Sequence, residues 1–125
     1  MIITIDTLSP SPIYEQIRNQ VVLGIAAGRL APGEGLPSVR RLAADLGINF
    51  HTVNKSYSIL CDEGYVVMDR RVGAVVAQKM SADTTFHEQL AAHLRLAAAE
   101  AACHGINEDE FVNLCKTQYH GGVKL

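Results

Sequence analysis

The sequence predicts a mostly α-helical chain with one small β-hairpin, and three observations support this fold class. Two short helical patterns lie on either side of Gly47, within residues 38–63. Two valine-rich runs, residues 65–68 and 74–77, follow directly and indicate a hairpin. Further helical patterns precede and follow this region. We therefore predict a winged helix-turn-helix over residues 1–78 and a two-helix appendage over residues 82–120.

The central helix pair has clear start and stop signals. Ser38 is a favourable N-cap for a first helix that ends at Leu46. Gly47 supplies the left-handed position after this helix, and Asn49 caps a second helix that runs to about Glu63. Two helices joined by so short a turn have the form of a helix-turn-helix.

The second helix leaves mostly polar side chains on the outer face of its first turns, whereas Val53, Ile59 and Leu60 point inward. The outward residues are Asn49, Phe50, His51, Thr52, Asn54 and Lys55. A recognition helix enters the major groove of DNA with its N-terminal residues, and the positive end of its dipole favours nearby phosphates. The alternative is an ordinary two-helix corner with a solvated polar face.

The predicted hairpin favours DNA binding. Its tip, residues 69–73, carries Arg70 and Arg71, which can touch a phosphate or enter a minor groove. Charge at a loop tip usually serves only solubility. A basic tip directly after a helix-turn-helix, however, has the form of a DNA-binding wing.

Five short motifs follow one another along the chain. They are Pro12 to Ile17, Gly28 to Gly33, Leu36 to Arg40, Thr52-Val53 and Glu63 to Tyr65. Over about residues 10–77 this order resembles the GntR family of bacterial transcription regulators. In that family the arginine of the Leu-Pro-Ser-x-Arg motif, the start of the recognition helix and the wing touch DNA. The predicted DNA-binding set, which also includes Lys55 and Tyr57 of the recognition helix, is Ser38, Arg40, Asn49, Phe50, His51, Thr52, Asn54, Lys55, Tyr57, Arg70, Arg71 and Gly73.

Two positions depart from the family pattern. Phe50 stands where the family usually has arginine, so that packing on a thymine methyl replaces a base or phosphate contact. The wing reads Arg-Arg-Val-Gly where Arg-x-Gly-x-Gly is usual, which predicts a stiffer turn. Both departures predict an operator that differs from the usual one of the family.

Residues 82–120 contain two further helical patterns. The first begins at Asp83 and ends before Gly105, and the second occupies about residues 108–118 after Asn107. Two helices of this length cannot bury a core of their own, because small units bury too small a fraction of their surface. Their apolar stripe therefore needs a partner.

We predict that this stripe forms a homodimer, because helix-turn-helix proteins normally bind a palindromic site as two-fold dimers. The predicted interface residues are Phe86, Leu90, Leu94, Ala97, Ala101, Phe111 and Leu114. The alternative is packing of the stripe on the winged unit. The short appendage is similar to that of the YtrA-like subfamily of GntR regulators, whose members often regulate transporter genes.

The remaining segments give weaker signals. Residues 1–6 alternate in polarity and predict a short strand. A scaffold helix is expected to begin at Pro12 with Ser11 as its cap. Residues 29–37, with two prolines, predict turns, and the tail from residue 121 to 125 is expected to fray.

Composition limits the class of protein. The chain has 125 residues with 48% hydrophobic content, enough for one domain or a small domain with an appendage. We expect no membrane span and no signal peptide. Three cysteines without metal-type spacing suit a reducing cytoplasm. The net charge of −2 is distributed unevenly along the chain. Residues 1–80 carry 8 Lys and Arg against 7 Asp and Glu, whereas residues 81–125 carry 3 against 6.

Enzyme and cofactor motifs are missing from the sequence. There is no nucleophile elbow, phosphate-cradling glycine loop or paired carboxylate set, so we expect neither an enzyme nor a cofactor. The histidines and cysteines of the appendage are expected to be surface histidines and buried cysteines rather than a metal site. The sequence identifies no small-molecule effector.

The predicted function is that of a sequence-specific DNA-binding regulator, a repressor acting as a homodimer on a palindromic operator. The alternatives are a winged-helix module that docks proteins, or a ligand- or metal-responsive sensor with little DNA affinity.

Overall fold

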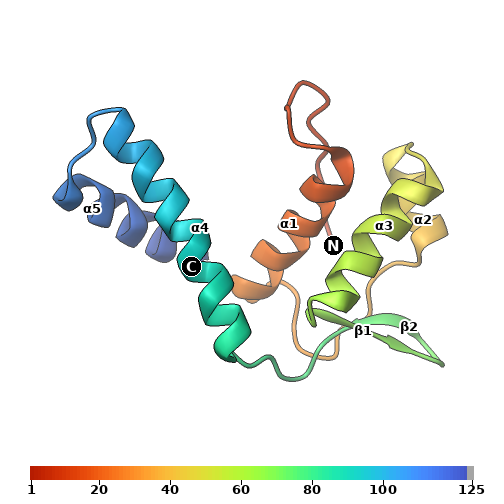
Figure 1. Cartoon of the computed structure of the whole chain (residues 1–125). Helices are drawn as coiled ribbons and strands as arrows, with labels where there is room; N and C mark the ends of the chain where they lie inside the picture. The colour runs from red at the N-terminus through yellow and green to blue at the C-terminus, as the bar shows by residue number, and fades with distance from the viewer. Residues whose placement is uncertain (124–125) are drawn as a thin grey trace. The chain divides into compact units, whose positions relative to one another are not determined.

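The computed structural model describes residues 1–123 and divides after Met80 into two compact units. The first unit contains α1 (Ile13–Ala26), α2 (Val39–Leu46), α3 (Phe50–Asp62), β1 (Val66–Asp69) and β2 (Gly73–Val76) (Figure 1). The second contains α4 (Thr84–Cys103), α5 (Glu108–Gln118) and a π-helical turn (Tyr119–Val123). The predicted fold class, a winged helix-turn-helix followed by two helices, is confirmed.

The predicted caps fix the ends of the central helices. The Ser38 hydroxyl accepts a hydrogen bond from the Arg41 backbone N–H at 3.1 Å. Gly47 ends α2 with φ +66°, a backbone conformation that residues with a Cβ rarely adopt. The Asn49 side chain then accepts from the His51 N–H at 2.8 Å and starts α3. These short-range bonds orient α3 sharply against α2.

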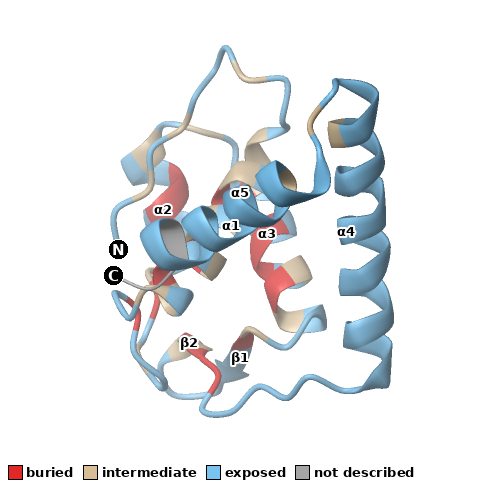
Figure 2. Cartoon of the chain, turned by 90° about the vertical axis from the view of Figure 1, so that its left-hand side faces the viewer, coloured by how far each residue is buried: buried red, intermediate tan, exposed pale blue. Residues whose placement is uncertain are grey.

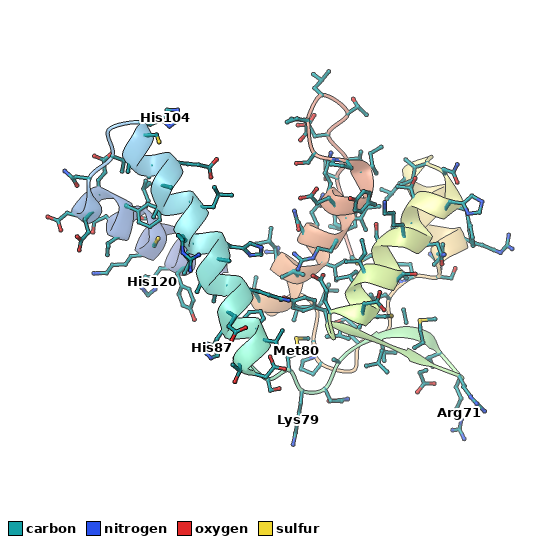
Figure 3. All side chains as sticks on the ribbon, in the orientation of Figure 1. Arg71, Lys79, Met80, His87, His104 and His120 are labelled. Atoms are coloured by element: carbon teal, nitrogen blue, oxygen red, sulfur yellow. The ribbon has the colours of Figure 1, made fainter. Side chains whose placement is uncertain are left out.

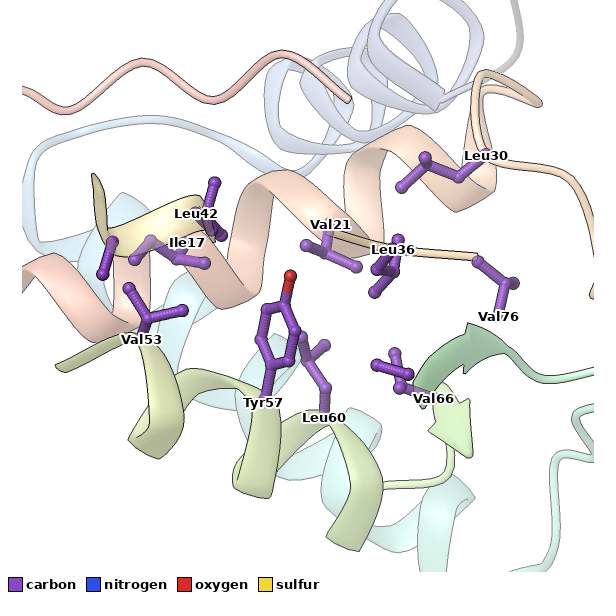
Figure 4. Packing of buried hydrophobic residues seen from close by; sticks show 12 residues of the cluster. Ile17, Val21, Leu30, Leu36, Leu42, Val53, Tyr57, Leu60, Val66 and Val76 are labelled. Atoms are coloured by element: carbon purple, nitrogen blue, oxygen red, sulfur yellow. The ribbon is translucent and has the colours of Figure 1, made fainter. Parts of the chain in front are cut away.

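The core of the first unit lies between α1, α2, α3 and the hairpin (Figure 4). Its fully buried members include Ile17 and Val21 of α1 and Val53 and Leu60 of α3. Ser56, also fully buried, donates its hydroxyl hydrogen to the Tyr14 carbonyl at 2.8 Å, which satisfies a polar group where α1 meets α3. Burial in Figure 2 concentrates on these elements of the first unit. The core therefore holds α3 with one face inward and the other exposed.

The hairpin is antiparallel and pairs Val66 with Val76 and Asp69 with Gly73. Its strands begin and end one residue from the expected positions. The Asp69 carboxylate accepts from the Arg71 N–H at 2.7 Å and from the Val72 N–H at 3.3 Å. Gly73 has φ +84° and is the left-handed residue that closes the three-residue hairpin loop. This turn chemistry supports the prediction of a rigid wing.

The connection between α1 and α2 contributes to the sheet, which the prediction of turns alone missed. Gly35 forms an isolated bridge with Val75, and the Gly33 N–H donates to the Val76 carbonyl at 2.8 Å. The Leu36 N–H donates to the Ala74 carbonyl at 2.8 Å. The connection thus covers one edge of β2 and fixes the wing to the helices.

The expected strand over residues 1–6 is wrong. Glutamine side chains of α1 pair with this segment instead: Gln20 accepts from the Thr4 N–H at 3.0 Å and donates to the Thr4 carbonyl at 2.6 Å. Gln16 likewise accepts from the Asp6 N–H at 2.9 Å. These side chains, four residues apart on one helix, take the place of a neighbouring strand.

The expected start of α1 is also corrected. The helix begins at Ile13, and its N-cap is Pro12, which makes no side-chain cap hydrogen bond. Ser11 therefore does not cap it. Its N–H instead donates to the Ser9 hydroxyl at 3.1 Å in the preceding turn.

The second unit has well-formed helix ends but no buried side chain among residues 81–121. Asp83 accepts from the Phe86 N–H at 2.8 Å, and Asn107 accepts from the Glu110 N–H at 2.9 Å. Of the tail from residue 121 onward, for which we predicted fraying, residues 121–123 belong to the π-helical turn and 124–125 lie outside the described residues. Within residues 1–123, the helices are all too short or too polar to cross a membrane.

Candidate nucleic-acid interface

The first turns of α3 place a polar surface opposite the core. Val53 is fully buried and anchors the helix, whereas Asn49, His51 and Asn54 are exposed. Thr52 is partly buried at the edge of this surface. Because the Asn49 carboxamide oxygen is occupied in capping, its NH₂ group provides the hydrogens available to an outside acceptor. The surface therefore offers donors and acceptors at the positive end of a helix dipole.

Arg40 of α2 joins this surface through Phe50. Its guanidinium carbon lies 5.2 Å from the centroid of the Phe50 ring, within the range of a cation–π contact. The Phe50 and His51 rings meet edge to face, with centroids 5.6 Å apart and planes at 85°. The structure thus brings together three of the predicted residues in one contiguous aromatic and cationic cluster.

Lys55 is held by an interaction that sequence reasoning missed. Its ammonium nitrogen lies 3.9 Å from the centroid of the Tyr14 ring at the start of α1. Lys55 remains exposed, so the cation is oriented without being neutralised. The sequence separation of Tyr14 and Lys55 gives no local signal for this pair.

Tyr57 was wrongly predicted to contact DNA. Its side chain is only 4% exposed and belongs to the core (Figure 4). Its hydroxyl donates to the Pro37 carbonyl at 2.7 Å. Burial raises the pKa of the phenol to about 12, so the group stays neutral. The physical reason is helical spacing, since Tyr57 lies four residues after Val53 on the inward face.

The wing presents its basic residues at the tip. Arg70 and Arg71 are exposed, and Arg71 extends outward from the end of the hairpin (Figure 3). Gly73 lies at the base of the turn and is partly buried, so its part in the wing is to shape the backbone. Asp69 is occupied with backbone N–H groups of the same turn. The tip therefore projects two guanidinium groups.

The charges of the first unit are distributed unevenly. Arg18 forms an ion pair with Glu63 at 2.9 Å, a contact across 45 positions that the sequence does not signal. Arg41 lies 3.9 Å from Asp45 in an exposed pair. Within the described residues, Arg40, Arg70 and Arg71 form no ion pair. The cations without an ion pair among the described residues therefore include those beside the recognition helix and on the wing.

A match to a protein-family model establishes the family to which this chain belongs. The model described as bacterial regulatory proteins, gntR family, matches residues 13–76, from the start of α1 to the end of β2. The chain belongs to the GntR family. The matched residues form the helix-turn-helix domain of that family.

Curated GntR relatives support this assignment. The HTH-type transcriptional repressor YtrA of Bacillus subtilis is 41% identical over 86 residues, 69% of this chain. The HTH-type transcriptional regulator Rv1152 of Mycobacterium tuberculosis is 36% identical over 74 residues, 59% of this chain. The chain covers less than two thirds of the length of either protein, 65% of YtrA and 61% of Rv1152.

Solved structures extend the likeness. YtrA from Sulfolobus acidocaldarius, a GntR-family transcription factor, is 41% identical with a TM-score of 0.67; the match covers 79% of this chain and 99% of that one. A transcriptional antiterminator from Listeria monocytogenes is 28% identical with a TM-score of 0.85. This match covers 93% of this chain and 88% of the antiterminator. The DNA-binding domain of AraR in complex with operator ORX1 is 25% identical with a TM-score of 0.52. This match covers 60% of this chain and 93% of the AraR domain. The chain is a YtrA-like GntR regulator.

The two-helix unit of this GntR regulator exposes its apolar residues. Phe86, Leu90 and Leu94 of α4 are exposed, as is Leu114 of α5. Phe111 and Ala101 are partly buried, and Ala97 is exposed. Most of the predicted stripe is therefore exposed, and only Phe111 and Ala101 are partly covered.

The prediction that the cysteines of this unit are buried is wrong. Cys103 and Cys115 are both exposed, because the unit has no core of its own to receive them. Cys61 of α3 packs against the core, and burial raises the pKa of its thiol. Over residues 1–123, no three His, Cys, Asp or Glu side chains are grouped as a metal ion would need.

A cavity of about 290 Å³ lies in the first unit. It is lined by the N-terminal residues Met1 and Ile2, by Gln20, Leu23 and Gly24 of α1, and by Arg29 and Leu30 beyond the helix. Its volume is at the lower end of ~300–1,000 Å³ for small-molecule pockets.

Proposed function

We propose that this GntR regulator acts in the cytoplasm as a homodimeric repressor on a palindromic operator in double-stranded DNA. The single observation that carries the DNA contact is the exposed polar start of α3, beside Arg40, whose guanidinium lies on the Phe50 ring and forms no ion pair within the described residues. Such a surface matches the way in which a recognition helix reads base edges in the major groove.

Individual residues have different roles in this proposal. His51, Thr52 and Asn54 face the bases, because they lie on the outer side of the first turns of α3. Ser38, Asn49 and Lys55 are also exposed, and we assign phosphate contacts to them. Arg70 and Arg71 enter an adjacent minor groove or bind its phosphates, positioned by the turn at Gly73.

Dimerisation is supported by the second unit. Its stripe of Phe86, Leu90 and Leu94 is exposed although these residues are large and apolar. Burying such a stripe against a second copy removes it from water and brings two recognition helices onto one duplex. Two half-sites related by a two-fold axis then form the palindrome.

Names of the relatives support repression and operator binding. The Bacillus subtilis relative is called a transcriptional repressor, and the AraR domain was crystallised with an operator. Repression requires only that the protein occupies its operator, so the proposed DNA contacts and the proposed dimer are sufficient for it.

Selection of bound duplexes from a random library tests the proposal. We expect enrichment of an inverted repeat whose half-site centres lie about one helical turn apart, 10–10.5 base pairs, or a multiple of this. His51→Ala is expected to change the enriched bases, because this side chain faces the groove. Enrichment of no motif by the folded protein would contradict sequence-specific binding.

A second candidate function is the docking of another protein on the wing. Val67, Met68 and Val72 of the hairpin are exposed apolar residues, which a solvated loop does not need. The same selection separates the candidates, since a protein-docking module enriches no duplex.

A further inference from the structure

We propose that the cavity at the end of α1 binds a small monocarboxylate with an apolar chain, of the size of octanoate. The cavity is formed by residues 1–2, by α1 and by the connection that follows it, and none of its lining residues belongs to α2, α3 or the hairpin. The site is therefore separate from the DNA contacts proposed above, and its failure would leave the proposed function unchanged.

The walls of the cavity are mostly apolar. Met1, Ile2 and Leu23 line it although all three are exposed to solvent. Leu30, a fourth lining residue, is buried and belongs to the core (Figure 4). Exposed apolar side chains that gather around a hollow are typical of a ligand-binding site, whereas isolated ones are ordinary on a protein surface.

One wall of the cavity is held in place by Gly24 of α1. Its carbonyl accepts hydrogen bonds from the Arg29 N–H at 2.9 Å and from the Leu30 N–H at 3.1 Å. A Cβ at Gly24 would lie 3.1 Å from Cδ1 of Leu30, so the glycine allows this side chain to pack directly on the helix. These contacts fix the backbone of the connection on α1. The wall that Arg29 and Leu30 form is therefore present before a ligand binds.

The polar side chains of the cavity indicate the charge of the ligand. Gln20 is occupied, because its carboxamide accepts from the Thr4 N–H at 3.0 Å and donates to the Thr4 carbonyl at 2.6 Å. The Arg29 guanidinium forms no ion pair or hydrogen bond among residues 1–123. Of the lining residues, Arg29 alone has a charged side chain. A guanidinium matches a carboxylate with two parallel N–H donors, and a carboxylate is ionised at neutral pH. The ligand therefore carries one carboxylate.

The volume of the cavity indicates the length of the ligand. A water molecule takes up about 30 Å³ of liquid, so a cavity of about 290 Å³ holds about ten non-hydrogen atoms. Octanoate, which has eight carbon and two oxygen atoms, is of this size. With its carboxylate on Arg29, its chain contacts Leu23 and Leu30 and is removed from water.

Titration of the isotope-labelled full chain with octanoate, followed by NMR at neutral pH, tests the site. We expect saturable shifts of the backbone amides of Leu23, Gly24, Arg29 and Leu30. Octanamide, which has the same shape without the charge, should bind about two- to five-fold more weakly, the value of one exposed ion pair. The proposal would be overturned if these four amides showed no saturable shift, as when a second copy covers the cavity, or if only residues 84–118 responded.

Arg29→Gln tests the carboxylate contact. This variant should bind octanoate about two- to five-fold more weakly than the wild type and octanamide equally well, so that the preference for the charged probe disappears. Arg95→Gln removes an exposed arginine of α4 that does not line the cavity, and as the matched control it should keep the preference. A preference for octanoate that survives in Arg29→Gln would overturn the role of Arg29.

Leu23→Asp tests the apolar wall. Leu23 is 44% exposed, so we expect the variant to fold, which circular dichroism checks. The change removes an apolar contact and adds a carboxylate to the cavity of Arg29, so octanoate should bind at least about ten-fold more weakly. Leu96→Asp makes the same substitution at an exposed leucine outside the cavity and should bind octanoate like the wild type. Unchanged octanoate affinity of folded Leu23→Asp would overturn the cavity as the binding site.

Discussion

Leu94→Asp is expected to convert the proposed homodimer into a monomer and to lower affinity for the proposed palindromic operator by about 10²–10⁴-fold, the factor typically lost when two linked sites no longer bind together. Leu94 lies at the centre of the predicted stripe on α4 and is 47% exposed in the single chain. A carboxylate buried at the interface loses its hydration without gaining a partner, so the dimer is destabilised. Sedimentation equilibrium measures the mass, and anisotropy titration measures the affinity.

Leu96→Asp is the matched control for this change. Leu96 lies two residues further along α4, off the stripe, and is 64% exposed. The same substitution there should leave both mass and affinity unchanged. A Leu94→Asp protein that remains dimeric would show that α4 does not form the interface along this stripe.

Arg40→Ala is expected to weaken operator binding about 5- to 150-fold, the value of 1–3 kcal/mol for a good bidentate contact to a base. The guanidinium is already positioned on the Phe50 ring and forms no ion pair within the described residues, so its removal costs the folded protein little. Circular dichroism and thermal unfolding should therefore match the wild type, while a gel-shift titration shows the loss.

Arg29→Ala provides the comparison for Arg40→Ala. It removes an exposed arginine of the same unit from the connection after α1, away from the recognition surface. Its effect on affinity should be small, because it changes net charge without removing a base contact. Equal losses for the two variants would indicate that only overall charge matters.

Helix ends were predictable because their chemistry is local. Ser38, Asn49, Asp83 and Asn107 each accept from a backbone N–H two or three residues later, and Gly47 ends α2 by its own conformation. Such signals lie within one turn of sequence. They sufficed to place the helix-turn-helix and both helices of the appendage.

Long-range contacts were not predictable from the sequence. Gln16 and Gln20 pair with the N-terminal segment, and Arg18 pairs with Glu63 only after α1 and α3 have packed. The pairing of Gly35 with Val75 likewise depends on the assembled hairpin. Each contact joins residues ten or more positions apart, where periodicity and caps carry no information.

Tyr57 and the cysteines show two different errors in predicting the site. Tyr57 was included in the DNA-binding set as a residue of the recognition helix, although its four-residue spacing from Val53 signals an inward position. Its hydroxyl donates to the Pro37 carbonyl instead. Cys103 and Cys115 follow the usual burial of cysteine, which fails where a unit has no core. The DNA contacts of the remaining predicted residues stay predictions.

Binding to a selected palindrome, before and after insertion of about five base pairs between its half-sites, tests the central proposal most directly. Half a helical turn places the half-sites on opposite faces of the duplex, where one dimer cannot reach both. We predict a complex of two chains per duplex on the original site and, on the altered duplex, affinity reduced to that of a single half-site. Equal affinity for both duplexes would contradict a homodimer that reads a palindromic operator.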